Sequence, residues 1–141
     1  MSQYLLDTNV VSEAMRKQPA AAALAWLEAQ SGDALFISAI TLGEIRRGAL
    51  LLPDGRKRRA LLRWIDSDIK EVYAARILPA DAEVMERWAT LQAECQLEGR
   101  TLPAFDSLIA ATALAHRLTL VTRNVADFAG TGVPLLNPWD A

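Results

Sequence analysis

The sequence predicts an α/β fold in which a small parallel sheet of four to five strands is flanked by helices, and two observations favour it. Short apolar runs bounded by polar or turn residues alternate along the chain with longer helical patterns. The chain has 141 residues, of which 52% are hydrophobic, and this suffices for one domain with a buried core. Strands and helices that alternate in this order form parallel sheets covered on both faces.

Three apolar runs are typical of strands: QYLLD at 3–7, DALFIS at 33–38 and LTLVT at 118–122. A short apolar pair opens the segment ILPADAEV at 77–84 and suggests a further strand, after which Asp81 suits a helix start. The helical patterns cover 21–30, 37–52, 56–76, 81–99 and 105–117. Asp54 and Gly55 mark a turn, and Pro103 stands where a helix can begin.

Composition excludes several classes of function. The net charge of −2 shows no overall basic balance of the kind typical of nucleic-acid binders. The single cysteine, Cys95, forms no internal disulfide and fits a reducing cytoplasm, and no apolar run approaches the length of a membrane span. One histidine, His116, excludes chemistry that needs a histidine pair or a multi-histidine metal site. Hydrolytic chemistry here must therefore rely on carboxylates.

Acidic and amide residues gather at one edge of the predicted sheet. In open α/β sheets the functional crevice lies beyond the carboxyl ends of the strands. Asp7 ends the first strand, Glu44 lies on the helix after the second, and Asp106 is in the first turn of a later helix. Asn124 and Asp127 follow the last predicted strand. Four segments far apart in sequence thus contribute to one candidate site.

Carboxylates gathered at a partly buried edge repel one another unless a cation neutralises them. Oxygen ligands without histidine or cysteine favour Mg²⁺ or Mn²⁺ over Zn²⁺. Mg²⁺ keeps several waters and takes one or two carboxylates, which leaves positions for phosphate oxygens and for a nucleophilic water. The pattern therefore indicates metal-assisted phosphodiester hydrolysis.

Each acid also has an ordinary structural explanation. Asp7 can cap a helix that begins with NVVSEAM, and Glu44 can be a solvated helix residue. Asp106 can be a first-turn acid favoured by the helix dipole, and Asp127 can be a loop residue. The joint occurrence of all four at strand ends and neighbouring helices favours a site.

Basic residues cluster in the segment RRGALLLPDGRKRR at 46–59. Such a cluster can follow a phosphate backbone despite the acidic total, and it shares a predicted helix with Glu44. The alternative is a solvated surface that pairs with the acidic DSD at 66–68. The candidate RNA contacts are Arg46, Arg47, Arg56, Lys57, Arg58 and Arg59.

Four segments carry a resemblance to a known family: LLDTNVVSE near the start, SAITLGEIRRG around Glu44, FDSLIAATALAHRLTLVTRNVADF from Asp106 onward, and the ending VPLLNPWDA. The sequence resembles the PIN-domain ribonucleases, specifically the VapC-type toxins of type II (VapBC) toxin–antitoxin systems. The resemblance covers essentially the whole chain. It implies a single PIN domain at 1–141 with a three-layer fold.

The resemblance also implies roles for individual residues. Asp7 and Asp106 would be the principal Mg²⁺ ligands, with Glu44 as the third acid and Mn²⁺ able to substitute. The family commonly carries a fourth acid where this chain has Asn124. Asn124 can then bond a metal-bound water, Asp127 can take part, or three acids can suffice.

Thr8, Asn9 and Thr122 match positions that support the acids or the metal waters in similar proteins. The implied activity is endonucleolytic hydrolysis of RNA that leaves a 5′ phosphate and a 3′ hydroxyl. The implied partners are a VapB-like antitoxin that inhibits the enzyme, operator DNA reached only through the antitoxin, and a second copy of the chain in a homodimer.

Two other functions compete with this one. A non-catalytic PIN-like module would act through antitoxin and operator DNA binding, and Asn124 in place of an acid supports it. Phosphotransfer through an aspartyl phosphate at Asp7 is the second. DTN lacks a further aspartate, and no lysine follows the later strand in LTLVTRNVADF, so the sequence disfavours phosphotransfer.

Overall fold

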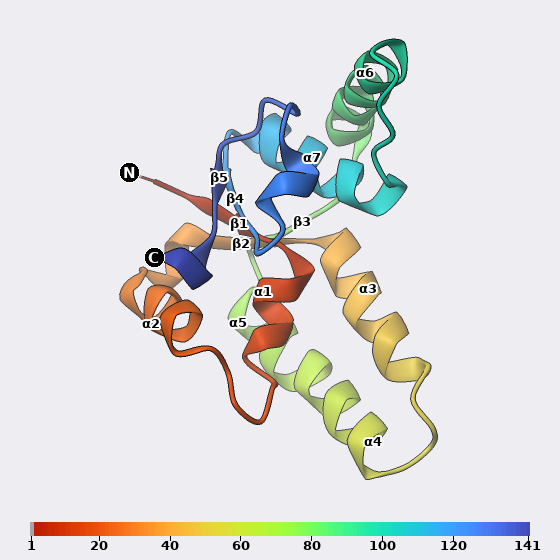
Figure 1. Ribbon diagram of the computed structural model, residues 1–141. Coiled ribbons are helices and arrows are strands. Elements are labelled where there is room, and N and C mark those ends of the chain that lie inside the picture. Colours follow the sequence, from red (N-terminus) through yellow and green to blue (C-terminus); the bar gives the residue numbers. More distant parts are fainter. Residues whose placement is uncertain (1) are drawn as a thin grey trace.

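A five-stranded parallel sheet with the strand order β3-β2-β1-β4-β5 forms the centre of the protein (Figure 1), in a computed structural model that describes residues 2–141. Every neighbouring pair of strands runs parallel. The strands are Tyr4–Leu6 (β1), Leu35–Ser38 (β2), Ile77–Leu78 (β3), Thr119–Val121 (β4) and Leu135–Leu136 (β5). Because β1 is central, the residue after it lies between the carboxyl ends of β2 and β4.

Helices cover both faces of the sheet, and the predicted three-layer α/β class is confirmed (Figure 1). On one side lie α6 and α7, and on the other lie α1, α2, α4 and α5, while α3 contacts both α1 and α7. The helices are Thr8–Glu13 (α1), Ala21–Ala29 (α2), Ala39–Leu50 (α3), Arg56–Arg63 (α4), Lys70–Val72 (α5), Ala82–Leu97 (α6) and Ala104–His116 (α7). Shorter turns are Gly32–Ala34 (η1), Trp64–Ile69 (η2), Val125–Phe128 (η3) and Pro138–Asp140 (η4).

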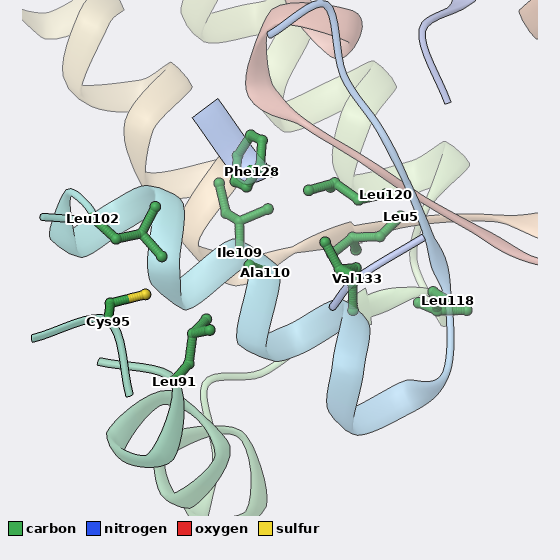
Figure 2. Packing of buried hydrophobic residues seen from close by; sticks show 11 residues of the cluster. Leu5, Leu91, Cys95, Leu102, Ile109, Ala110, Leu118, Leu120, Phe128 and Val133 are labelled. Carbon is green, nitrogen blue, oxygen red and sulfur yellow. The ribbon is translucent and has the colours of Figure 1, made fainter. Parts of the chain in front are cut away.

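The strands alternate between two hydrophobic clusters because successive side chains point to opposite faces of a sheet. Leu5 and Leu120 pack with α6 and α7 in the first cluster, which Figure 2 shows from close by. Leu6 and Val121 pack with α1, α3 and η2 in the second. Full burial of each such side chain stabilises the fold by about 1.5–3 kcal/mol. The alternation fixes the register of β1 and therefore the place of Asp7.

Polar side chains start the helices that follow β2 and β3. Ser38 Oγ accepts a hydrogen bond of 3.0 Å from the N–H of Ile40 at the start of α3. Asp81 Oδ1 accepts one of 3.1 Å from the N–H of Val84, so the predicted helix start at Asp81 is confirmed.

Among residues 2–141, no helix is both long and apolar enough to cross a membrane.

Two expectations about secondary structure are wrong in detail. The helix expected over 37–52 begins at Ala39, because Ile37 and Ser38 belong to β2. The single helix expected over 56–76 contains the π-helical turn η2 and ends at Val72. Arg76 explains this end, because its guanidinium donates to the carbonyls of Val72 at 2.6 Å and Leu35 at 2.9 Å and so ties the chain back to β2.

Candidate metal centre

Asp7 directly follows the central strand β1, at the carboxyl edge of the sheet, and its carboxylate accepts three hydrogen bonds. Its backbone N–H donates to the carbonyl of Val121 at 2.9 Å, which continues the pairing of β1 with β4. Its Oδ1 caps α1 by accepting from the N–H of Thr8 at 2.8 Å. Its Oδ2 accepts from Thr122 Oγ1 at 2.8 Å and from Asn9 Nδ2 at 3.3 Å. Only 5% of Asp7 is exposed, so the cap also serves as a fixed, buried carboxylate.

Glu44 joins Asp7 through Thr8. The Thr8 hydroxyl donates to Glu44 Oε1 at 2.7 Å, directly after the residue that carries the first acid. The Thr41 hydroxyl lies 3.3 Å from the same hydroxyl and is fully buried, and Thr41 was not among the residues predicted for the site. Its position three residues before Glu44, on the same helix face, was the available signal.

Thr122 organises the chain after β4. Its hydroxyl, which donates to Asp7, accepts the backbone N–H of Asn124 at 3.0 Å. The N–H of Arg123 donates to Asn9 Oδ1 at 3.3 Å. Thr8, Asn9 and Thr122 therefore all lie against the acids, whereas Asn124 meets Thr122 through its backbone N–H and is exposed.

Asp106 and Asp127 line the same cleft of about 480 Å³. Asp106 is half-buried in the first turn of α7, and Asp127 is exposed in the turn η3 that follows β4. The structure thus brings Asp7, Glu44, Asp106 and Asp127 to one edge of the sheet.

The negative charges of these acids act on one another. Burial is the main cause of a raised pKa at Asp7, and the charges of Glu44 and Asp127 raise this pKa further, while the bonds from Thr122 and Thr8 oppose the shift. Burial also raises the pKa of Asp106, and the charges of Asp7 and Asp127 add to it. A cation at this edge would relieve the charge repulsion that adds to both shifts.

Because of these shifts, we expect Asp7 to lower the stability of the chain as pH rises in the absence of divalent cations. Above the ordinary pKa of 3.8, the unfolded chain loses the Asp7 proton while the folded chain retains it up to the raised pKa. Ionisation of Asp7 therefore costs folding free energy as pH rises through that window. Denaturant unfolding of the wild type and Asp7→Asn in EDTA, from pH 4 to 7, should show the variant gaining stability relative to the wild type. The free energy of unfolding of the variant minus that of the wild type should increase as pH rises. A difference that stays constant or decreases would contradict the raised pKa of Asp7.

The donor set fits a hydrated hard cation. Within the part of the chain that the structure describes, no three Asp, Glu, His or Cys side chains stand together so as to hold one metal ion. A ligand set of Asp7, Glu44 and Asp106 acting directly on one ion is therefore not preformed. An ion that takes one or two carboxylates and keeps several waters does not need three preformed ligands, and Mg²⁺ is such an ion.

The basic residues divide into two groups. Arg46 and Arg47 share α3 with Glu44; Arg46 forms an ion pair with Asp66, and Arg47 lines a small pocket with Glu44. The others lie at the start of α4, beside the α3–α4 loop and away from the sheet (Figure 1). These are Arg56, Lys57, Arg58 and Arg59, of which Arg59 forms an ion pair with Asp54 at 3.5 Å. Part of the predicted pairing with the acids at 66–68 is thus present at Arg46.

A parallel sheet with carboxylates gathered at the carboxyl ends of its central strands defines an α/β protein with its candidate site in the crevice where such sheets place their functional residues. Residues 4–132 match the PIN domain family. The chain belongs to this family, in the group of VapC-type toxins, as the resemblance predicted.

Two relatives match nearly the whole chain. It is 36% identical to the VapC ribonuclease Y4jK of Sinorhizobium fredii (strain NBRC 101917 / NGR234), over 96% of this chain and 97% of the relative. It is 39% identical to the toxin FitB of Neisseria gonorrhoeae (strain ATCC 700825 / FA 1090), again over 96% and 97%.

Solved structures agree with the fold. The crystal structure of FitAcB from Neisseria gonorrhoeae superimposes with a TM-score of 0.93 at 38% identity, over 99% of this chain and 100% of that one. VapBC2 from Rickettsia felis, bound to a DNA fragment from its promoter, superimposes with a TM-score of 0.74 at 25% identity, over 95% and 97%.

Proposed function

We propose that this protein is a metal-dependent endoribonuclease that hydrolyses RNA phosphodiester bonds and acts as the toxin of a toxin–antitoxin pair. The observation that carries the proposal is the convergence of Asp7, Glu44, Asp106 and Asp127, whose charges act on one another at a partly buried sheet edge. The relative named VapC ribonuclease Y4jK supports RNA as the substrate.

Asp7, Asp106 and Glu44 would hold Mg²⁺, with Mn²⁺ able to substitute, directly or through its waters. Mg²⁺ at this edge would supply Lewis-acid polarisation of the scissile phosphate and a lowered pKa for the attacking water. The role of the chain is to fix its oxygens in advance: Thr122, Asn9 and the N–H of Thr8 orient the Asp7 carboxylate. Hydrogen bonds that orient ligands in this way set both the affinity for the metal and the geometry of the site.

For the fourth acidic position we propose Asp127 rather than Asn124. The charge of Asp127 acts on both Asp7 and Asp106, and its side chain lines the cleft that contains Asp106. The backbone of Asn124 is bound to Thr122, which suits a role in shaping the turn that presents Asp127.

The phosphate backbone of the RNA would extend from the acids along the basic residues of α3 and of the start of α4. Arg47 would bind RNA beside the metal centre, because it lines a pocket with Glu44. Arg46 is held by Asp66 and would contribute charge from that pair. The group at the start of α4 would reach phosphates further along the strand, with an affinity that falls as salt rises.

The proposed partners are a VapB-like antitoxin that inhibits the enzyme and a second copy of the chain in a homodimer. Operator DNA would be reached only through the antitoxin. The proteins of the FitAcB and VapBC2 structures support an antitoxin partner, and the VapBC2 structure contains promoter DNA. The free, buried Cys95 is consistent with the cytoplasm as the compartment.

The proposal is tested by incubating purified chain with total RNA in Mg²⁺, in Mn²⁺ and in EDTA, and sequencing the new RNA ends. We expect discrete cleavage sites with 5′ phosphates in either metal and none in EDTA. Equal cleavage in EDTA would contradict metal dependence. Absent cleavage by a chain that still binds its antitoxin would favour the non-catalytic module instead.

A further inference from the structure

We propose that Arg100 is a positioning residue that fixes Asp106 and Asp127 relative to each other by tying together the two walls of their shared cleft. The inference rests on the proposed function, since it concerns the spacing of two acids of the metal centre. Arg100 lies outside the four family segments in the sequence, and its role comes from contacts between distant parts of the chain.

Each wall of the cleft carries one acid. The first wall is the connection from α6 to α7, including Thr101 and Leu102, and it leads into Asp106. The second wall is η3 and the residues after it, including Asp127 and Ala129. The spacing of the acids therefore depends on how the two walls are held.

The backbone of Arg100 is anchored to α6. Gly99 adopts a left-handed conformation with φ +73°, and its N–H donates to the carbonyl of Gln96 at 3.0 Å. The N–H of Arg100 donates to the carbonyl of Cys95 at 2.8 Å. This pair of bonds is the Schellman motif that ends helices, and Cys95 is buried in the first hydrophobic cluster. Arg100 thus projects from a fixed point on the first wall.

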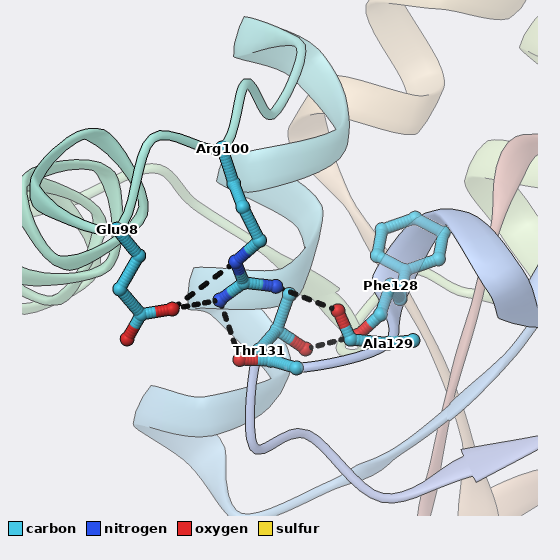
Figure 3. A network of polar contacts seen from close by, with 6 residues as sticks. Glu98, Arg100, Phe128, Ala129 and Thr131 are labelled. Carbon is cyan, nitrogen blue, oxygen red and sulfur yellow. Dashed lines mark hydrogen bonds and ion pairs between the residues drawn. The ribbon is translucent and has the colours of Figure 1, made fainter.

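Its guanidinium crosses to the second wall (Figure 3). Nη1 donates to the carbonyl of Ala129 at 3.2 Å, and Nη2 donates to the carbonyl of Gly130 at 3.2 Å. On the other side, Glu98 Oε2 lies 2.9 Å from Nη2 and accepts from Nε at 3.1 Å. The planar fork of arginine makes these contacts together, which a lysine ammonium cannot do.

Gly130 is fitted to this contact. Its φ of +81° belongs to the region that disfavours side chains, and an added Cβ would lie 2.3 Å from Arg100 Nη1. The guanidinium therefore lies directly against the backbone of the second wall. Phe128, buried in the core, precedes the exposed pair Ala129 and Gly130, and Arg100 binds the carbonyls of both exposed residues.

The test compares Arg100→Ala and Arg100→Lys with the wild type, and uses exposed Arg87 of α6 for the control Arg87→Ala. Mn²⁺ affinity is measured by calorimetry on the chain without RNA, and kcat and KM are measured for RNA cleavage. Loss of a residue that orients metal ligands typically weakens metal binding or activity by roughly 10- to 100-fold. We expect both Arg100 variants to show such a weakening in Mn²⁺ affinity and in kcat with KM almost unchanged, and Arg87→Ala to match the wild type.

A double-mutant cycle with Gly130→Ala adds a second measurement. In the wild-type background the new methyl group should displace the guanidinium and lower Mn²⁺ affinity. In Arg100→Ala the clash is absent and only the backbone strain at φ +81° remains, so the combined loss should be smaller than the sum of the two single losses. A combined loss of Mn²⁺ affinity equal to the sum of the two single losses would contradict the contact between Arg100 and Gly130 as the cause.

The outcomes separate this inference from the proposed function. If Arg100→Ala kept the Mn²⁺ affinity and kcat of the wild type, the proposed role of Arg100 would be overturned, and the proposed function would stand. A rise in KM alone, restored by Arg100→Lys, would overturn it too, since Arg100 would then act on RNA as a charge. A wild type that neither binds Mn²⁺ nor cleaves RNA would contradict the proposed function itself.

Discussion

Replacing Asp7 with asparagine should reduce RNA cleavage by at least about 100-fold, beyond what loss of an orienting residue costs, while leaving the fold intact. Asp7 lies at the centre of the proposed site, because it stands between the carboxyl ends of β2 and β4. The charges of Glu44 and Asp127 both raise its pKa. The substitution removes the negative charge and keeps the shape of the side chain. Asparagine also caps helices as well as aspartate does, so α1 should be retained.

The matched control is Asp33→Asn, the same chemical change in η1 before β2, at the opposite edge of the sheet. The Asp33 side chain is 98% exposed, and its contact with Arg76 is long at 3.9 Å. Cleavage rates with saturating Mg²⁺ should separate the two variants, with Asp33→Asn close to the wild type. If Asp7→Asn had normal circular dichroism and activity within a few-fold of the wild type, Asp7 would not be part of the metal centre.

Replacing Phe128 with alanine should destabilise the protein by about 3–5 kcal/mol, the range measured for large buried aromatic side chains. Phe128 is 1% exposed and packs against α7 and β4 in the first hydrophobic cluster (Figure 2). Removal leaves a cavity beside the turn that carries Asp127. The lost free energy therefore combines the transfer of the ring to water with the cavity that remains.

Denaturant unfolding measures this loss, and Phe105→Ala is its control. Phe105 is 52% exposed at the start of α7, so its truncation should change the free energy of unfolding by about 0.5 kcal/mol or less. A loss below about 1 kcal/mol for Phe128→Ala would show that the cluster tolerates the cavity and that the turn is not anchored there.

The sequence predicted the parts of the fold that repeat a simple pattern. The apolar runs that became β1, β2 and β4 alternate with helices, and this alternation determines a parallel sheet and places Asp7 at its carboxyl edge. The position of β5 was not predicted, because the two residues between Pro134 and Asn137 are too few to show any period. The π-helical turn at Trp64–Ile69 left no signal either, since its apolar residues fit an ordinary helix.

The candidate site shows the same division. Asp7, Glu44 and Asp106 stand in recognisable segments, and the structure places them at the same edge of the sheet as Asp127. The hydrogen bond between Thr122 and Asp7, and those from Arg100 to Ala129 and Gly130, join segments far apart in the chain. Such contacts depend on how loops pack against each other, and local periodicity carries no information about that.

The central claim is that Asp7, Glu44 and Asp106 bind a divalent cation. Calorimetric titration of Mn²⁺ into protein that has been stripped of metal with EDTA tests it most directly. Wild type, Asp7→Asn and Asp33→Asn are compared at the same pH, without RNA or antitoxin. We expect saturable Mn²⁺ binding by the wild type and by Asp33→Asn, and loss of this binding in Asp7→Asn. Absence of binding by the wild type, or unchanged affinity in Asp7→Asn, would contradict it.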